Sequence, residues 1–151
     1  MFTPKAELRA RIWTLLEREG VVRFPGAEGR IPNFAGAEKA AARLQALDDW
    51  RNARTIKANP DSPQRAVREL ALREGKKVYM AVPRLRKVKC FVELDPARLV
   101  GRYRQASTIK GAFRWGRPIL LEEMEPIDLI VAGSVAVTRE GARVGKGGGY
   151  S

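Results

Sequence analysis

The 151-residue, 16.8 kDa chain is long enough for one domain with its own core, and no segment has the roughly 20 apolar residues needed to span a bilayer. It contains no histidine and one cysteine, Cys90, which excludes Ser-His-Asp and Cys-His catalysis, histidine zinc sites and intrachain disulfides. Its 29 Lys and Arg against 17 Asp and Glu leave a net charge of +12, which indicates an anionic partner such as nucleic acid, ATP or a folate.

The first third of the chain predicts two helices separated by a loop. Thr3 is a suitable helix cap before Pro4, and apolar residues at helical spacing then run as far as Gly20. Residues 21–35 contain two Pro and two Gly and are expected to form a loop. A second helix is expected over about 37–50, where apolar residues again share one face.

The middle and end of the chain predict strands around a third helix. A short strand over about 54–58 is followed by NPDSPQ, in which Asp61 or Ser62 is expected to cap a helix. That helix stops before Gly75, and the runs KKVYMAVP and KCFVEL that follow are typical of strands. The last strand, DLIVA over 128–132, is apolar without alternation, as expected of a strand buried on both faces.

Strands that alternate with helices of about 10–15 residues predict βαβ units. We therefore expect a single α/β domain over residues 1–151, a three-layer αβα arrangement with a central, mainly parallel sheet. Such sheets bind ligands at the carboxyl ends of their strands. The loop after DLIVA is accordingly where we expect the chemistry.

The tail REGARVGKGGGYS, residues 139–151, has the composition of a phosphate-binding loop. Glycines let backbone amides approach a phosphate closely, and Arg143 and Lys146 supply positive charge. The pattern is neither a Walker A sequence nor a dinucleotide fingerprint, and a flexible hairpin tip would have a similar composition. The glycines of the pattern are Gly145, Gly147, Gly148 and Gly149.

This tail resembles the signature of the 5-formyltetrahydrofolate cyclo-ligases, also called methenyltetrahydrofolate synthetases. In that family a D-L-I strand and a G-x-R-L-G stretch precede G-[KR]-G-x-G-Y-Y-D. This chain has D-L-I at 128–130, G-A-R-V-G at 141–145 and K-G-G-G-Y at 146–150. Residues 5–9, KAELR, are similar to the family's K-x-x-L-R, and 75–83 to its G-K-x-V-x-x-P.

The resemblance implies a cyclo-ligase fold and the ATP-dependent conversion of 5-formyltetrahydrofolate to 5,10-methenyltetrahydrofolate. The single cysteine suits a reducing compartment, so we expect the chain in the cytoplasm. The resemblance also implies ATP and Mg²⁺ as cofactors and gives catalytic roles to Arg143 and Lys146. By its spacing to Gly75, Asp61 takes the place of the family's folate-contacting glutamate in E-x-x-T. The residues implied to bind the nucleotide are Lys5, Arg9, Gly145, Lys146, Gly147, Gly148, Gly149 and Tyr150.

The chain departs from the family pattern in three places. Ala132 and Gly133 replace a Pro-Gly pair, Ser151 replaces the second tyrosine, and E-x-x-T has no direct counterpart. RIPNFAGAEKAA and IKANPDSPQ are closer to a divergent cyclo-ligase-like branch, for which a link to thiamine metabolism has been suggested. The aspartate that the family places after its tyrosines would be residue 152, so we expect the native chain to continue and leave the metal ligand unassigned.

The basic segment between Arg84 and Arg117 leaves open a different class of function, a non-catalytic RNA-binding protein. Its cations are interleaved with Tyr103, Phe113 and Trp115, and such surfaces can follow a phosphate backbone and stack bases. A solvated basic face is the simpler interpretation, and no RNP, KH or zinc-knuckle pattern is present. We therefore prefer a reduced folate over nucleic acid as the partner.

Overall fold

The computed structural model describes residues 3–81 and 89–147, and its main feature is a five-stranded sheet of order β4-β3-β2-β1-β5. β1 runs parallel to both β2 and β5, whereas β3 is antiparallel to β2 and β4. The expected α/β class is confirmed, with a mixed sheet. Its strands are β1 (Thr55–Ala58), β2 (Lys77–Ala81), β3 (Phe91–Leu94), β4 (Arg117–Ile119) and β5 (Leu129–Val131).

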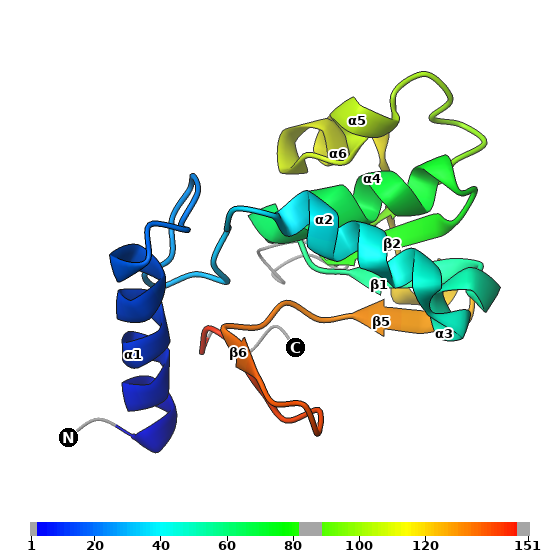
Figure 1. Ribbon diagram of the computed structural model, residues 1–151. Coiled ribbons are helices and arrows are strands. Elements are labelled where there is room, and N and C mark those ends of the chain that lie inside the picture. The colour runs from blue at the N-terminus through cyan, green and yellow to red at the C-terminus, as the bar shows by residue number, and fades with distance from the viewer. Residues whose placement is uncertain (1–2, 82–88, 148–151) are drawn as a thin grey trace.

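Most helices gather on one side of this sheet (Figure 1). These are α2 (Ala37–Ala42), α4 (Arg65–Arg73), α5 (Tyr103–Ala106) and α6 (Ile109–Trp115). The chain also forms α3 (Asp48–Asn52) and the 3-10 turns η1 (Arg43–Ala46), η2 (Ser62–Gln64) and η3 (Leu121–Glu123). The remaining helix, α1 (Pro4–Arg18), stands apart from them beside a hairpin of β6 (Ala136–Val137) and β7 (Arg143–Val144).

The predicted start of α1 is confirmed. The hydroxyl of Thr3 accepts a hydrogen bond from the amide of Ala6 at 3.2 Å, and Pro4 occupies the first helical position. No residue of α1, which the structure describes throughout, is buried. Its apolar stripe includes Leu8 and Leu15, which stay 37% and 38% exposed, so α1 adds little to the core.

The core lies between the sheet and the helices around α4. It contains apolar side chains from β1, β2 and β3 together with residues of α4 and the buried ring of Trp50. The indole nitrogen of Trp50 donates to the carboxylate of Glu74 at 3.1 Å, so its polar atom is satisfied. The largest fully buried apolar side chains are Trp50, Tyr79, Ile56, Leu72, Met80, Leu94 and Ile119.

The single helix expected over 37–50 is wrong. The structure breaks this stretch into α2, η1 and α3, with Leu47 in an extended conformation (φ −91°, ψ 132°) between η1 and α3. The break turns the chain so that Trp50 enters the core, where it is completely buried. Because Leu47 itself is 53% exposed, helical spacing across the break did not reflect one continuous buried face.

The burial expected for the last strand is also wrong. β5 pairs with β1, and Ile130 at its centre is 59% exposed. An apolar run reveals hydrophobicity but not strand order, so it cannot distinguish a central strand from one at an edge of the sheet.

Among the helices that the structure describes, none combines the length and the apolar composition required to cross a membrane.

Candidate functional site

The carboxyl ends of β1 and β5 define the candidate site. β1 continues through α4 to β2 on one side, while β5 pairs on the other side of β1. The edge between β1 and β5 is therefore a topological switch point, where open α/β sheets bind ligands. The loop 59–64 leaves β1 there, and the loop 132–134 leaves β5 beside it.

The side chain of Gln64 joins the two strand ends. Its Oε1 accepts a hydrogen bond from the amide of Asn59 at 3.0 Å, and its Nε2 donates to the carbonyl of Val131 at 3.1 Å. Gln64 is 4% exposed, and both ends of its amide are satisfied. One buried amide group therefore ties the two strand ends together.

Asp61 faces the loop that follows β5. A Cβ atom added to Gly133 would lie 2.3 Å from Oδ2 of Asp61 and 3.1 Å from a side-chain carbon of Ile31, so this position accepts only glycine without rearrangement. Oδ2 is buried and has no hydrogen-bond partner among the described residues. Burial raises the pKa of Asp61, an effect opposed by the charge of Lys146, a hydrogen bond from Asn59 and the charge of Arg68.

This position of Asp61 corrects the prediction that it or Ser62 caps a helix. Neither η2 nor α4 has a side-chain hydrogen bond at its N-terminus. The carboxylate of Asp61 lies against Gly133 instead of folding back onto the helix amides. The helix start itself, at NPDSPQ, is confirmed by η2 and α4.

The β6–β7 hairpin brings Arg143 and Lys146 to the same place. Nε of Arg143 donates to the hydroxyl of Ser134 at 2.9 Å, and Nη2 donates to the carbonyl of Gly133 at 2.6 Å. Lys146 follows β7 and is near enough to oppose the rise in the pKa of Asp61. Arg143, Lys146 and Asp61, which are distant in sequence, therefore surround one loop.

Helix α1 contributes Arg9 to this region. Nε of Arg9 donates to the carbonyl of Gly145 at 2.6 Å, and a Cβ atom on Gly147 would lie 3.4 Å from the same guanidinium. Lys5 is exposed one helical turn before Arg9, so both side chains project from the same face of α1. Gly148, Gly149 and Tyr150 lie outside the described residues.

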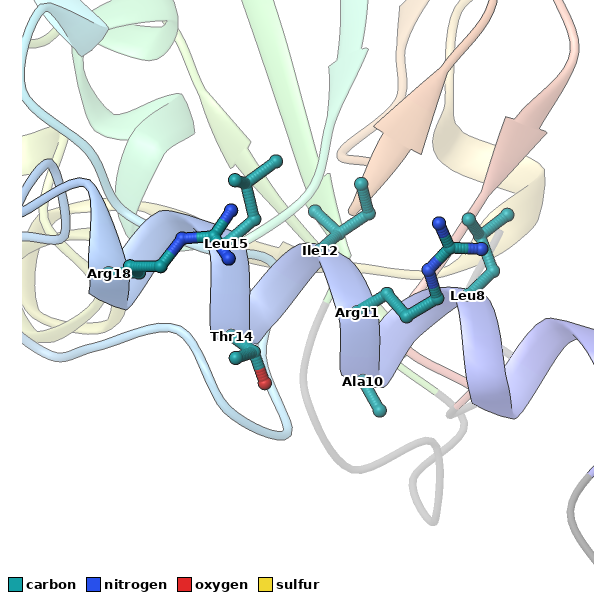
Figure 2. Close-up of a pocket in the computed structure, with 7 residues that line it drawn as sticks. All are labelled: Leu8, Ala10, Arg11, Ile12, Thr14, Leu15 and Arg18. Carbon is teal, nitrogen blue, oxygen red and sulfur yellow. The ribbon is translucent and has the colours of Figure 1, made fainter.

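A groove of about 510 Å³ runs along α1 but is not part of this site. Figure 2 shows that Leu8, Ile12 and Leu15 project to one side of the helix, away from Ala10 and Thr14. The groove is lined by this exposed apolar stripe together with Ala10, Thr14 and two arginines, and its lining includes neither the strand ends nor the glycine-rich segment. The candidate site is therefore defined by its hydrogen bonds and charges.

The donor set fits a phosphate group. Cationic side chains and glycine amides supply the hydrogen bonds and positive charge that bind phosphate oxygens. The residues from 3 to 81 and 89 to 147 contain no group of three or more acidic or cysteine side chains arranged to hold a metal.

The acidic residues before β5 have structural partners. Glu125 pairs with Lys77 at 2.7 Å, and Glu123 pairs with Arg117 at 3.2 Å. Asp128 accepts hydrogen bonds from the backbone amides of Arg54 and Thr55, at 2.8 and 3.2 Å, and so fixes the start of β1. These side chains support the sheet and lie at the opposite end of β1 from the candidate site.

Sequence reasoning missed three buried polar residues behind Asp61. Asn59, Gln64 and Arg68 are 6%, 4% and 1% exposed, and all three hold the loop after β1. Polar side chains directly after a buried strand were the available signal. The interpretation of NPDSPQ as a helix start already accounted for Asn59 and Gln64, so their role at the end of β1 was not recognised.

The aromatic residues of the basic segment are mostly committed to the fold. The hydroxyl of Tyr103 donates to the carbonyl of Pro96 at 2.9 Å, and its ring packs against the core. Trp115 also packs against the core, with the guanidinium groups of Arg102 and Arg114 5.7 and 4.8 Å from its ring centre. Of the three aromatics considered for base stacking, Phe113 remains substantially exposed.

Almost the whole length of this chain matches one known protein family and its relatives. The model of the 5-formyltetrahydrofolate cyclo-ligase family matches residues 2–151. Proteins named "Methenyltetrahydrofolate synthase domain-containing protein" are 40% identical in Mus musculus, 37% in Bos taurus and 35% in Homo sapiens, each over 150 residues. These alignments cover 97% of this chain, which spans 39–40% of the length of those relatives. The chain belongs to the 5-formyltetrahydrofolate cyclo-ligase family.

Proposed function

We propose that this chain binds ATP at its glycine-rich segment and uses it to convert 5-formyltetrahydrofolate to 5,10-methenyltetrahydrofolate. One observation carries the proposal: Asp61 and Gly133 meet where the carboxyl ends of β1 and β5 come together, and Lys146 is near enough to act on the charge of Asp61. A cation suited to phosphate and a carboxylate suited to a heterocycle therefore belong to one region of the structure. Membership of a cyclo-ligase family supports a site with one part for the nucleotide and one part for the folate.

The nucleotide half of the site is proposed to consist of Lys5, Arg9, Lys146 and the glycine amides. Arg9 holds the carbonyl of Gly145 and thereby orients the segment that would approach the phosphates. Phosphoryl transfer requires positioning and positive charge rather than covalent chemistry by the protein. The lack of histidine is consequently no obstacle to this reaction.

ATP would supply the phosphoryl group that activates the formyl oxygen, and Mg²⁺ would offset the charge of the phosphates. The neighbouring nitrogen of the folate would then attack the formyl carbon and release its proton to water, and inorganic phosphate would leave with the former formyl oxygen. In this reaction Lys146 stabilises the negative charge on the transferring group. Arg143 adds its charge and holds the loop through the carbonyl of Gly133.

The folate half of the site is proposed to depend on Asp61. Its Oδ2 is a buried acceptor without a donor among the described residues. A pterin ring carries N–H groups that can donate hydrogen bonds to a carboxylate. A substrate that supplied this hydrogen bond would satisfy the acceptor, while an analogue without the donor would leave it unpaired. Asp61 would thus contribute to selection of the substrate.

The test is an assay of the purified protein with ATP, Mg²⁺ and 5-formyltetrahydrofolate, followed by the absorbance of the methenyl product. We expect ATP-dependent product formation that Asp61→Asn abolishes while ATP binding is retained. Lys39→Ala, which removes an exposed charge on α2, is the matched control and should leave turnover unchanged. Intact ATP binding without consumption of the folate would contradict the folate assignment and favour another nitrogen heterocycle, such as a thiamine-related compound.

A further inference from the structure

Arg68 is a buried cation at the centre of the structure behind the candidate site. It projects from α4, is 1% exposed and donates to three backbone carbonyls. Nε binds the carbonyl of Ser107 at 2.9 Å, while Nη1 binds those of Asn59 at 2.6 Å and Asp61 at 3.1 Å. Burial lowers the pKa of Arg68 to about 10.

A charge in this environment is costly for folding. Removal of a guanidinium from water is unfavourable even when its hydrogen bonds are satisfied, and apolar replacements of buried ions are often neutral or stabilising. The core around α4 is otherwise apolar, with Val67, Ala71 and Leu72 on the same helix. Stability alone therefore gives little reason for an arginine at this position.

Two of the three carbonyls that Arg68 binds belong to the loop that carries Asp61. Residues 59–61 connect β1 to η2, and their backbone has to place the Asp61 carboxylate against Gly133. Two of the three hydrogen bonds of Arg68 end in this loop, and the third joins it to the turn between α5 and α6. A planar guanidinium can hold these separate carbonyls in a fixed geometry, which a lysine ammonium cannot reproduce.

Arg68 also acts on Asp61 through charge. The charged groups that face Asp61 are Arg68 from α4 and Lys146 from the segment after β7, and Asn59 adds a hydrogen bond. Both cations favour the ionised carboxylate against the effect of burial. Lys146 would be drawn toward a bound nucleotide phosphate, whereas Arg68 is fixed in the interior.

On the basis of the function proposed above, we propose that Arg68 is a positioning residue. It holds the backbone of residues 59–61 and presents Oδ2 of Asp61, as a carboxylate, to an N–H donor of the heterocyclic substrate. Its effect should fall on the second substrate and spare ATP, because its hydrogen bonds end on the β1 loop rather than on the glycine-rich segment.

The first test compares Arg68→Lys with Arg73→Lys, an exposed arginine on the same helix. Arg68→Lys keeps the positive charge but loses the planar guanidinium with its several N–H donors. We therefore expect KM for 5-formyltetrahydrofolate to rise about tenfold, with KM for ATP unchanged. Arg73→Lys should change neither value. Equal increases in both KM values would indicate a general structural defect and overturn the proposal, as would an unchanged folate KM.

A double-mutant cycle then asks whether Arg68 acts through Asp61. In the Asp61→Asn background, Arg68→Lys should raise KM for the folate by much less than it does alone, because the two residues serve one interaction. Full additivity of the two effects would contradict the positioning role. Thermal unfolding of each variant separates these effects from a loss of folded protein.

A second readout does not depend on the substrate. The pKa of Asp61, followed by the chemical shift of its carboxyl carbon, should be higher in Arg68→Met than in the unsubstituted protein, because the charge of Arg68, which favours the ionised carboxylate, is lost. An unchanged value would overturn the proposal. If the unsubstituted protein turned over no 5-formyltetrahydrofolate, the proposed function would fail, while this titration would still decide whether Arg68 acts on Asp61.

Discussion

Gly133 and Asp61 approach each other so closely that a Cβ atom on Gly133 would lie 2.3 Å from Oδ2 of Asp61. They follow β5 and β1, so their contact marks the point where the carboxyl ends of two parallel strands meet. Arg143 fixes Gly133 from one side by a hydrogen bond to its carbonyl, and Arg68 fixes the backbone of Asp61 from the other. The site is thus assembled by packing between loops that are more than 70 residues apart.

Gly133→Ala should therefore disturb the site more than a methyl group would elsewhere. The carboxylate of Asp61 has to move, and forcing a methyl group into a packed space commonly costs about 1–3 kcal/mol in the free energy of unfolding. We expect a loss of this size in urea unfolding, together with loss of folate turnover. Ala132→Ser, at the exposed neighbouring position, should change neither.

The cause can be separated from a general effect of the methyl group. In an Asp61→Ala background the atom nearest to the new methyl group is absent, so Gly133→Ala should cost much less stability there. An equal cost in both backgrounds would show that contact with Asp61 is not what requires glycine at position 133.

Asp61→Asn should separate stability from function. The raised pKa of Asp61 means that its contribution to stability is fully present below the ordinary value of 3.8 and is lost as pH rises through the folded-state pKa. The variant does not suffer this loss, so near pH 7 it should unfold at a higher urea concentration than the unsubstituted protein. The difference should vanish near pH 3, while folate turnover is lost at every pH. A less stable variant at neutral pH would contradict this account.

Arg9→Ala should weaken ATP binding without unfolding the protein. Arg9 lies on a helix with no buried residue and donates to the carbonyl of Gly145, so its role is to hold the glycine-rich segment. A hydrogen bond to a charged group contributes about 1.5–3 kcal/mol, so we expect Kd for ATP to rise about tenfold or more. Arg11→Ala on the same helix is the control, and calorimetric titration should find its Kd unchanged.

Asp128 should have the opposite pH dependence to Asp61. Hydrogen bonds from the backbone amides of Arg54 and Thr55 lower the pKa of Asp128, so its stabilising effect is present above the ordinary pKa of 3.8 and is lost as pH falls through the lower folded-state value. Asp128→Ala should lower the urea midpoint at neutral pH and lose this effect in acid. Glu122→Ala, at an exposed position before β5, should have little effect at either pH.

The elements with strong local signals could be predicted from the sequence. Thr3 and Pro4 specify the start of α1, and NPDSPQ specifies the start of the helix after β1. The break between η1 and α3 could not be predicted, because it depends on where the Trp50 ring finds space in the core. The exposed position of β5 likewise follows from strand order, which short apolar runs do not encode.

The candidate site was accessible to sequence reasoning in part. The glycine-rich tail and the residues Arg143 and Lys146 stand out by composition, while their closeness to Asp61 follows from the sheet and the hairpin. Gln64 and Arg68 were not recognised, because their roles consist of hydrogen bonds to backbone carbonyls and amides that form only after β1 and β5 are side by side.

The most direct test of the central claim is a calorimetric titration of ATP with Mg²⁺ into Lys146→Ala, Lys39→Ala and the unsubstituted protein. If the glycine-rich segment holds the phosphates, Lys146→Ala should weaken binding at least about tenfold, as expected for loss of a charge-assisted hydrogen bond. Lys39→Ala should bind as the unsubstituted protein does. Equal affinity of all three proteins for ATP, or no binding to any of them, would contradict the proposed nucleotide site.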